Sequence, residues 1–303
     1  MKQQFRTVIY AICLTSFLFF SISCSKYFKS DKDKIKSAQQ NQPIPPPKRD
    51  VPGKRFTLSV GQLYVPDFFD PSLTEKTEVV IFFHGAAWCS EQNFYDSRKN
   101  AILVSISSKN YSELFVDANS FSKLIEEITK TLTNEGITSK PIGKICLASF
   151  SGGYVAVREI LKYKEFQNLI TDVVLADSLY ASRLEGKPNT IDPEAMKPFL
   201  EYAQRAASGE CTFWFSQLYP PKKKHRNNTT TLTAFYLIEK IGAERTYPKS
   251  AYSSRKAKIL YRADKGNFHI LGYSGMTIQD HFEHFYGISD LYKETSLTPA
   301  RKS

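Results

Sequence analysis

The chain has 303 residues, of which 42% are hydrophobic and 14% aromatic, and its formal net charge is +11 at pH 7. This apolar content excludes a disordered chain, and the length suits one large α/β domain or two small ones. The positive charge is compatible with nucleic acid or an anionic envelope surface, but no aromatic-interleaved basic stripe or nucleic-acid motif accompanies it. The densest basic cluster, residues 222–226, is therefore interpreted as a solvated loop, and no nucleic-acid partner is expected.

The amino terminus has the pattern of an export signal. A positively charged start precedes an apolar run over residues 8–22, which is short for a membrane span. The run ends in Ser21-Ile22-Ser23-Cys24, which resembles a bacterial lipobox, although Leu is commoner where Ser21 stands. The resemblance implies a signal peptide over residues 1–23, lipidation of Cys24, and a lipoprotein anchored in the cell envelope, periplasmic or surface-facing. A cleaved soluble protein and an uncleaved N-terminal anchor remain the alternatives.

Two segments are expected to lie outside the folded domain. Residues 24–52 are rich in Lys, Ser, Gln and Pro, and such a stretch buries too little apolar surface to order itself. It is interpreted as a flexible tether that carries the lipid, with a stiffer proline-rich end. Residues 53–295 are expected to form the domain, and residues 296–303 a disordered tail.

Strands and helices alternate through the domain. This alternation predicts an α/β fold with a mainly parallel central sheet and helices on both faces. The strands are expected at residues 56–60, 62–65, 78–83, 101–107, 142–149, 171–176, 211–215, 256–263 and 267–273. The helices are expected at residues 121–132, 154–163, 193–207 and 230–241.

The buried run 78–83 leads directly into His84-Gly85-Ala86-Ala87. Small residues after a buried strand let the backbone approach another group closely. His84 itself is interpreted as a structural histidine that holds this loop.

The centre of the sequence is Ser149-Phe150-Ser151-Gly152-Gly153, which joins a strand to a helix. A tight turn with Ser151 at its apex is the geometry of a nucleophile elbow. The residues two before and two after the serine must be small, and here they are Ser149 and Gly153, although Gly is usual at the first position. The alternative is an ordinary β–α turn whose serines cap the helix.

A carboxylate and two histidines are candidates to act with Ser151. Asp177 ends the next buried strand, where functional groups gather in a parallel sheet, although a helix cap is the alternative. Asp264 and Asp280 are the weaker candidates for the acid. His281 and His284 follow the last strand at the start of the final helix. They lie one helical turn apart, so a shared metal is conceivable, but no third ligand is evident and no metal or cofactor is expected.

Ser151, Asp177 and the tail histidines occur in the chain order Ser, Asp, His, and with the His-Gly loop they resemble the α/β-hydrolase superfamily from about residue 53 to 295. The chain looks most like exported bacterial serine hydrolases of that superfamily. The resemblance implies a Ser151–Asp177–His281 triad, with His284 as the second choice of base. It also implies an oxyanion hole from the backbone N–H groups of Gly152 and of Ala86 or Ala87.

The implied activity is hydrolysis of a carboxylic ester, on a small-molecule or lipid substrate, through an acyl-enzyme. Two other functions stay open. One is a hydrolase fold that has lost turnover and binds a ligand at the envelope, and the other is a peptidase or amidase that acts on envelope peptides. The sequence does not indicate an oligomeric state.

Overall fold

The computed structural model describes residues 42–187, 190–221 and 229–301. From Pro43 onwards the chain forms one compact unit. The predicted signal peptide, Cys24 and the basic cluster 222–226 lie outside the described residues. Within the described ranges, no helix is both long and apolar enough to cross a membrane.

A 10-stranded sheet forms the centre of this unit, in the order β1-β2-β4-β3-β5-β6-β7-β10-β9-β8. From β4 to β10 in that order neighbouring strands pair in parallel, whereas β1, β2, β9 and β8 are attached antiparallel at the two edges. The strands are β1 (Gly53–Leu58), β2 (Gly61–Pro66), β3 (Thr77–Phe83), β4 (Ile102–Ile106), β5 (Ile142–Phe150), β6 (Ile170–Ala176), β7 (Thr212–Tyr219), β8 (Glu244–Thr246), β9 (Ile259–Lys265) and β10 (Phe268–Ser274).

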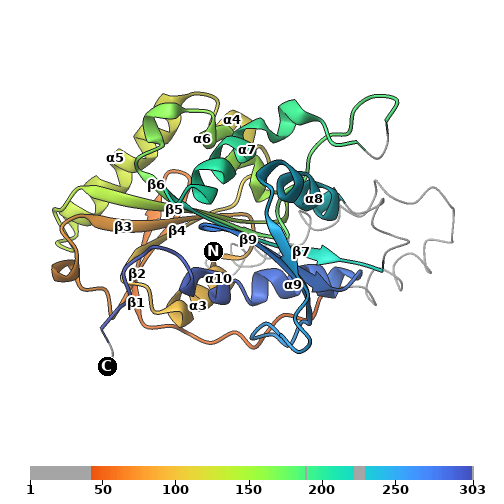
Figure 1. Ribbon diagram of the computed structural model, residues 1–303. Helices are drawn as coiled ribbons and strands as arrows, with labels where there is room; N and C mark the ends of the chain where they lie inside the picture. The colour runs from red at the N-terminus through yellow and green to blue at the C-terminus, as the bar shows by residue number, and fades with distance from the viewer. Residues whose placement is uncertain (1–41, 188–189, 222–228, 302–303) are drawn as a thin grey trace, which may run out of the picture. The chain divides into compact units, whose positions relative to one another are not determined.

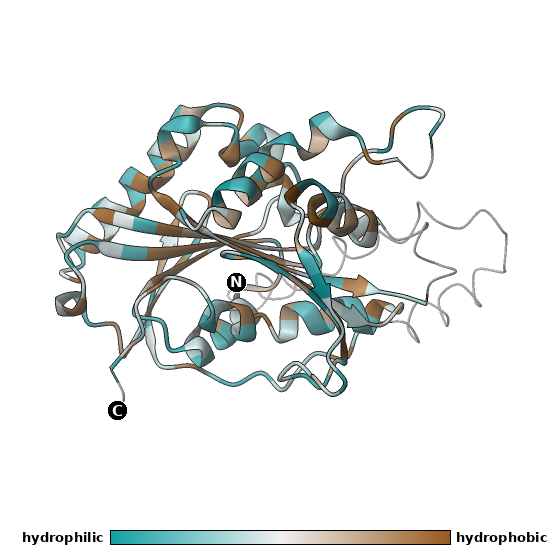
Figure 2. Cartoon of the chain, viewed as in Figure 1, coloured by the Kyte–Doolittle hydropathy of each residue, from teal (hydrophilic) through white to brown (hydrophobic). Residues whose placement is uncertain are grey.

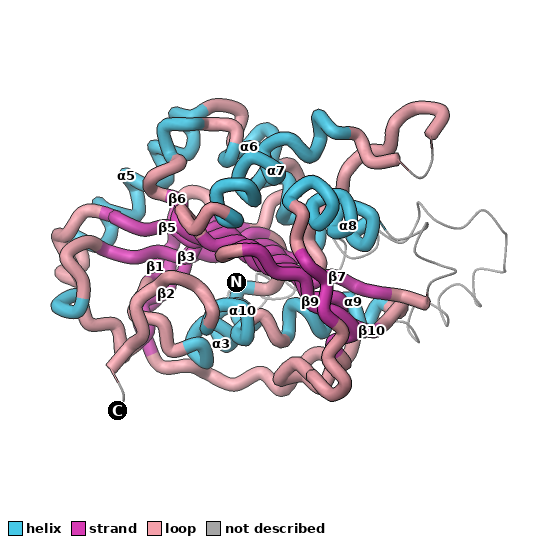
Figure 3. Tube along the Cα trace, viewed as in Figure 1, coloured by secondary structure: helices cyan, strands magenta, loops and turns pink. Residues whose placement is uncertain are grey.

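Helices cover both faces of the sheet, so the predicted fold class is confirmed (Figures 1 and 3). One face carries α4 (Tyr111–Leu114), α5 (Ala118–Asn134), α6 (Tyr154–Leu161), α7 (Pro193–Ala207) and α8 (Thr229–Ile241). The other face carries α3 (Ala87–Ser97), α9 (Ile278–Tyr286) and α10 (Ser289–Lys293). Three short 3-10 helices complete the described elements: η1 (Pro71–Leu73), η2 (Ser151–Gly153) and η3 (Lys164–Phe166).

The central strand β3 is buried along its whole length and divides the core in two. Val79, Ile81 and Phe83 belong to the apolar cluster under α5 to α8, whereas Val80 and Phe82 belong to the cluster under α3, α9 and α10. Successive side chains of a strand point to opposite faces, so a continuous apolar run is what a sheet covered on both sides requires. Figure 2 shows the apolar colouring concentrated in the sheet and on the helix faces that meet it.

The tether predicted over residues 24–52 ends earlier in the structure, because the compact unit begins at Pro43. The last residues of the predicted tether therefore belong to this unit. Val51 is only 3% exposed, and the backbone N–H groups of Ile44 and Arg49 donate to the side chains of Gln279 on α9 and Gln92 on α3. A polar, proline-rich segment can thus be ordered by side chains that satisfy its backbone, even though it buries little apolar surface of its own.

The prediction of a disordered tail over residues 296–303 is wrong for the described residues 296–301. Leu297 is 1% exposed. The backbone N–H of Ser296 donates to Asp172 Oδ1 at 2.7 Å, and that of Thr298 donates to Glu78 Oε2 at 2.7 Å. The tail is ordered because it satisfies two carboxylates that the sheet buries.

Candidate active site

Ser151 lies at the turn between β5 and α6, and its backbone has a left-handed φ of 50°. Such a conformation is costly for a residue other than glycine, and it is typical of a nucleophile elbow. The turn is held tightly against β3, because a Cβ on Gly153 would lie 2.3 Å from the carbonyl oxygen of Phe83. A Cβ on Gly152 would meet nothing within 4 Å, so the space beside the serine is open on that side.

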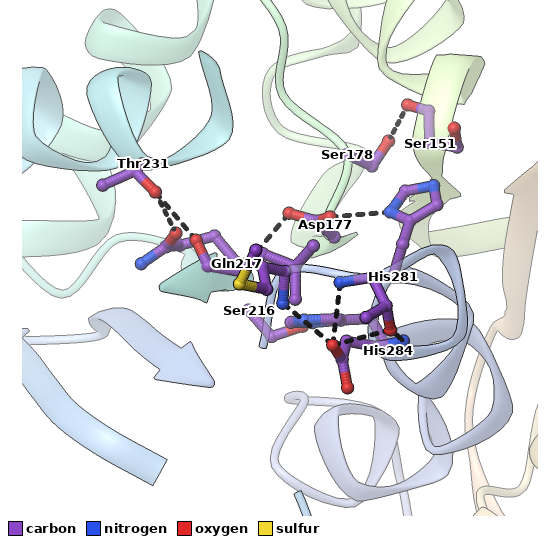
Figure 4. A network of polar contacts seen from close by, with 12 residues as sticks. Ser151, Asp177, Ser178, Ser216, Gln217, Thr231, His281 and His284 are labelled. Atoms are coloured by element: carbon purple, nitrogen blue, oxygen red, sulfur yellow. Dashed lines mark hydrogen bonds and ion pairs between the residues drawn. The ribbon is translucent and has the colours of Figure 1, made fainter. Parts of the chain in front are cut away.

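Asp177 follows directly after β6 and is 2% exposed. Its Oδ1 accepts a hydrogen bond from the backbone N–H of Leu218 on β7 at 3.0 Å, and its Oδ2 is 2.6 Å from His281 Nδ1 (Figure 4). Burial alone would raise the pKa of Asp177, but the hydrogen bond and the charge of His281, with smaller contributions from His284 and Leu218, lower it to about 2. The carboxylate is therefore ionised at neutral pH although it is buried.

His281 lies in the first turns of α9, whose start is fixed by a capping box between Thr277 and Asp280. The imidazole stacks on Phe150, the last residue of β5, with ring centroids 4.5 Å apart. Its side chain is 13% exposed. In Figure 4 the ring edge away from Asp177 faces Ser151, although no hydrogen bond joins these two described residues.

The second candidate base, His284, is placed differently. It is 2% exposed, its Nδ1 is 2.8 Å from Ser216 Oγ, and its ring stacks on Tyr273 with centroids 4.7 Å apart. Its Nε2 is buried without a hydrogen-bond partner among the described residues. Burial lowers the pKa of His284 to about 4. The structure therefore joins Asp177 to His281 and leaves His284 as a neutral, packed imidazole.

The predicted oxyanion residues lie where two helices begin beside the serine. Ala86 is the N-cap residue of α3 and makes no side-chain cap, and Ala87 is the first residue of that helix. The first N–H groups of a helix have no intrahelical acceptor, so this end can bind negative charge. The loop touches the elbow directly, because a Cβ on Gly153 would lie 3.0 Å from the Cβ of His84. Gly152 is the residue directly after Ser151, in η2.

The other histidines in the described part of the chain have separate partners. His84, with a left-handed φ of 73°, has its ring near Phe150 and Tyr111, and burial lowers its pKa. His269 Nδ1 is 2.5 Å from Asp264 Oδ1 on the neighbouring strand β9. Within the described ranges, no three His, Cys, Asp or Glu residues are grouped so that they could hold a metal ion.

Tyr180 is a neighbour of the serine that the sequence did not point to. Its ring lies 5.6 Å from that of Tyr154, which opens α6. Burial raises the pKa of Tyr180 well above its usual range, the charge of Asp177 raises it further, and the side chain of Ser151 lowers it. A tyrosine three residues after the carboxylate is no motif, so only the fold could place its hydroxyl near the nucleophile.

An apolar cavity of about 370 Å³ opens at the carboxyl ends of β7 and β10. It is lined by Tyr219, Pro220, Pro221, Leu260, Ser274, Gly275 and Met276. Leu218, which holds Asp177, comes directly before this lining, and the loop at residues 274–276 leads into α9. The cavity therefore borders the segments that position Asp177 and His281.

Comparison with solved structures returns esterases and lipases. The chain resembles the Francisella virulence factor BioJ (15% identity, 69% of this chain and 74% of that chain, TM-score 0.38) and an arylesterase (13%, 74% and 83%, 0.37). It also resembles an alpha/beta hydrolase from the metagenome of Lake Arreo, Spain (10%, 86% and 87%, 0.44). No protein-family model matches the sequence, and no curated protein is significantly similar to it. These similarities are distant, so the proposed function rests on the geometry of the site.

Proposed function

We propose that this chain is a serine hydrolase of the carboxylesterase type, with Ser151 as nucleophile, His281 as general base and Asp177 as the acid that orients it. The observation that supports this most is the 2.6 Å contact between His281 Nδ1 and the ionised Asp177. This pair lies beside Ser151, which has a left-handed backbone conformation at a strand-to-helix turn.

The proposed chemistry is acyl transfer. With the Nδ1 proton donated to Asp177, the Nε2 lone pair of His281 is free to accept a proton. Ser151 Oγ attacks the ester carbonyl carbon as His281 takes its proton, and Asp177 stabilises the imidazolium that forms. The N–H groups of Gly152 and of Ala86 or Ala87 would bind the oxyanion.

Collapse of the tetrahedral intermediate breaks the bond to the alcohol, which takes the proton from His281 and leaves an acyl-serine. Water, deprotonated by the same imidazole, then attacks the acyl carbon, and the carboxylic acid and Ser151 are released. Hydrogen bonds between nucleophile and base are often long before substrate binds, so the open Ser151–His281 pair is compatible with this cycle.

The substrate class is a small-molecule or lipid ester. The cavity of about 370 Å³, which borders the segments that position Asp177 and His281, is within the size range of small-ligand pockets. Its lining is mainly apolar, with Tyr219, Leu260 and Met276 among its side chains. An acyl or alcohol group without charge would fit such a lining, whereas a charged peptide segment would lose solvation there.

The direct test is the variant Ser151→Ala with p-nitrophenyl esters and a fluorophosphonate probe. We expect the wild-type protein to hydrolyse the ester and to be labelled by the probe. The variant should not be labelled, and its kcat should be lower by a factor on the order of 10^6. Equal melting temperatures would show that the loss is chemical. A folded wild-type protein that resists the probe and leaves esters intact would contradict the proposal and favour a ligand-binding role. Cleavage of peptide amides but not esters would favour a peptidase.

The choice of base is tested by a matched pair, His281→Gln and His284→Gln, assayed near pH 8. Both variants keep a neutral polar side chain on α9. Only the first removes the imidazole that meets Asp177, so we expect kcat to fall on the order of 10^4-fold or more in His281→Gln and to change little in His284→Gln. The reverse order would assign the base to His284.

We propose in addition that the protein is exported and anchored to the cell envelope through a lipid on Cys24. The support is the apolar run at residues 8–22 and the small residues before the cysteine. Incorporation of a labelled fatty acid that is lost in Cys24→Ser would support the anchor. Equal labelling of the variant would contradict it.

A further inference from the structure

Two buried serines form a chain of hydrogen bonds that ends on the backbone of the candidate nucleophile. Ser149 Oγ lies 2.8 Å from Ser178 Oγ, and Ser178 Oγ donates to the backbone carbonyl oxygen of Ser151 at 2.8 Å. Ser149 and Ser178 are both 0% exposed. Figure 4 shows the Ser178 side chain directed at the backbone of Ser151.

The direction of these bonds follows from the donors available. A serine hydroxyl has a single hydrogen, and Ser178 gives it to the carbonyl of Ser151. The bond between the two hydroxyls must therefore be donated by Ser149. Ser149 is thus the donor to Ser178, and Ser178 is the donor to the backbone of the elbow.

This chain of hydrogen bonds connects the turns that follow β5 and β6. Strands β5 and β6 are paired as far as Phe150 and Ala176, and the next residue on each strand leaves the ladder with a left-handed φ, 50° at Ser151 and 41° at Asp177. Neither turn is held to the other by strand pairing. Ser178, directly after Asp177, reconnects them through its hydroxyl.

We propose that Ser178, oriented by Ser149, is a positioning residue that fixes the nucleophile turn relative to the carboxylate turn. This rests on the proposed hydrolase function. It also explains the serine at position 149, where a nucleophile elbow usually has glycine: glycine is small enough but cannot donate a hydrogen bond.

The test uses Ser178→Ala, Ser149→Ala and the double variant, with Thr77→Val as control. Thr77 is 1% exposed and its hydroxyl donates to the backbone carbonyl oxygen of Lys140 at 3.0 Å, at the amino end of β3, away from the candidate site. We expect Ser178→Ala to lower kcat about ten- to a hundredfold with KM within about twofold, because small misplacement of a reacting group costs rate more than binding.

Ser149→Ala is expected to lower kcat less, and the double variant should be no slower than Ser178→Ala, because Ser149 acts only through Ser178. Thr77→Val should keep the wild-type kcat even if its melting temperature falls.

Two results would overturn the inference while the hydrolase function stands: a wild-type kcat in Ser178→Ala, or single effects that multiply in the double variant. An equal fall in kcat in Thr77→Val would also overturn it, since the loss would then follow from removal of any buried hydroxyl group. A wild-type protein that is inert toward ester and fluorophosphonate would instead overturn the proposed function itself, and with it the role of Ser178 in turnover.

Discussion

His284 should make the protein less stable in mild acid, through a proton that the folded state does not accept. Its side chain is 2% exposed, and burial lowers its pKa from 6.5 to about 4. The nearby charges of Asp177 and Asp280 act in the opposite direction, and His281 acts with burial. Above pH 6.5 the imidazole is neutral in both states and costs nothing. As pH falls from 6.5 through 4 the unfolded chain binds a proton that the folded chain does not, so stability is lost.

The size of the effect follows from the difference between the two pKa values. A lowering from 6.5 to about 4 corresponds to about 3 kcal/mol when the change is complete, and to about 2 kcal/mol at pH 5. This is a sizeable part of the stability of a typical domain. In the wild-type protein His84 also contributes to the dependence of stability on pH, because burial lowers its pKa. A variant is therefore needed to isolate the contribution of His284.

The assay is urea unfolding followed by circular dichroism at pH 8 and pH 5, for wild type and His284→Gln. Glutamine does not titrate, so the free energy of unfolding of the variant should fall by about 2 kcal/mol less than that of wild type over this interval. Parallel pH dependence in the two proteins would refute the reasoning, because the buried imidazole would then bind its proton as readily in the folded state as in the unfolded one.

Two further predictions concern the stability of the fold. Gly153→Ala should lower the free energy of unfolding by about 1–3 kcal/mol, because the new Cβ would lie 2.3 Å from a carbonyl oxygen of β3. Gly152→Ala should cost much less, because its Cβ would meet nothing within 4 Å. Equal melting temperatures of the two variants would contradict this prediction. Deletion of residues 296–303 should lower the free energy of unfolding by about 2–4 kcal/mol, because it removes hydrogen bonds to the buried carboxylates Asp172 and Glu78. If the truncated protein unfolds at the same urea concentration as the full-length protein, these bonds contribute nothing to stability.

The sheet and the elbow could be predicted because their signals are local. An apolar run of strand length, a turn of small residues and a helical repeat are each visible within a few positions, and β5, Ser151 and α6 follow that order. Boundaries were less accurate. The strand predicted at residues 211–215 continues to Tyr219, and its extension carries Leu218, the backbone partner of Asp177.

Helix α3 was not predicted because its buried face is polar. Glu91, Gln92 and Asn93 are 4–6% exposed, so the helix lacks an apolar stripe along the sequence. Their partners come from distant segments: Glu91 accepts from Arg55 at 2.8 Å, and Asn93 Oδ1 accepts from the backbone N–H of Ser289 at 3.2 Å. The predictions for the end of the tether and for the tail are wrong for the same reason, since side chains far away in the sequence satisfy the polar groups of both segments.

The choice between His281 and His284 could not be settled by spacing. The two residues lie three apart on α9, and both face the sheet. What separates them is the group that each Nδ1 meets, a carboxylate for His281 and the hydroxyl of Ser216 for His284. In the proposed mechanism the base becomes an imidazolium during the reaction, and a carboxylate in direct contact stabilises that charge more than a hydroxyl does. The proposal therefore assigns the base to His281, whose Nδ1 meets a carboxylate 104 positions earlier in the chain.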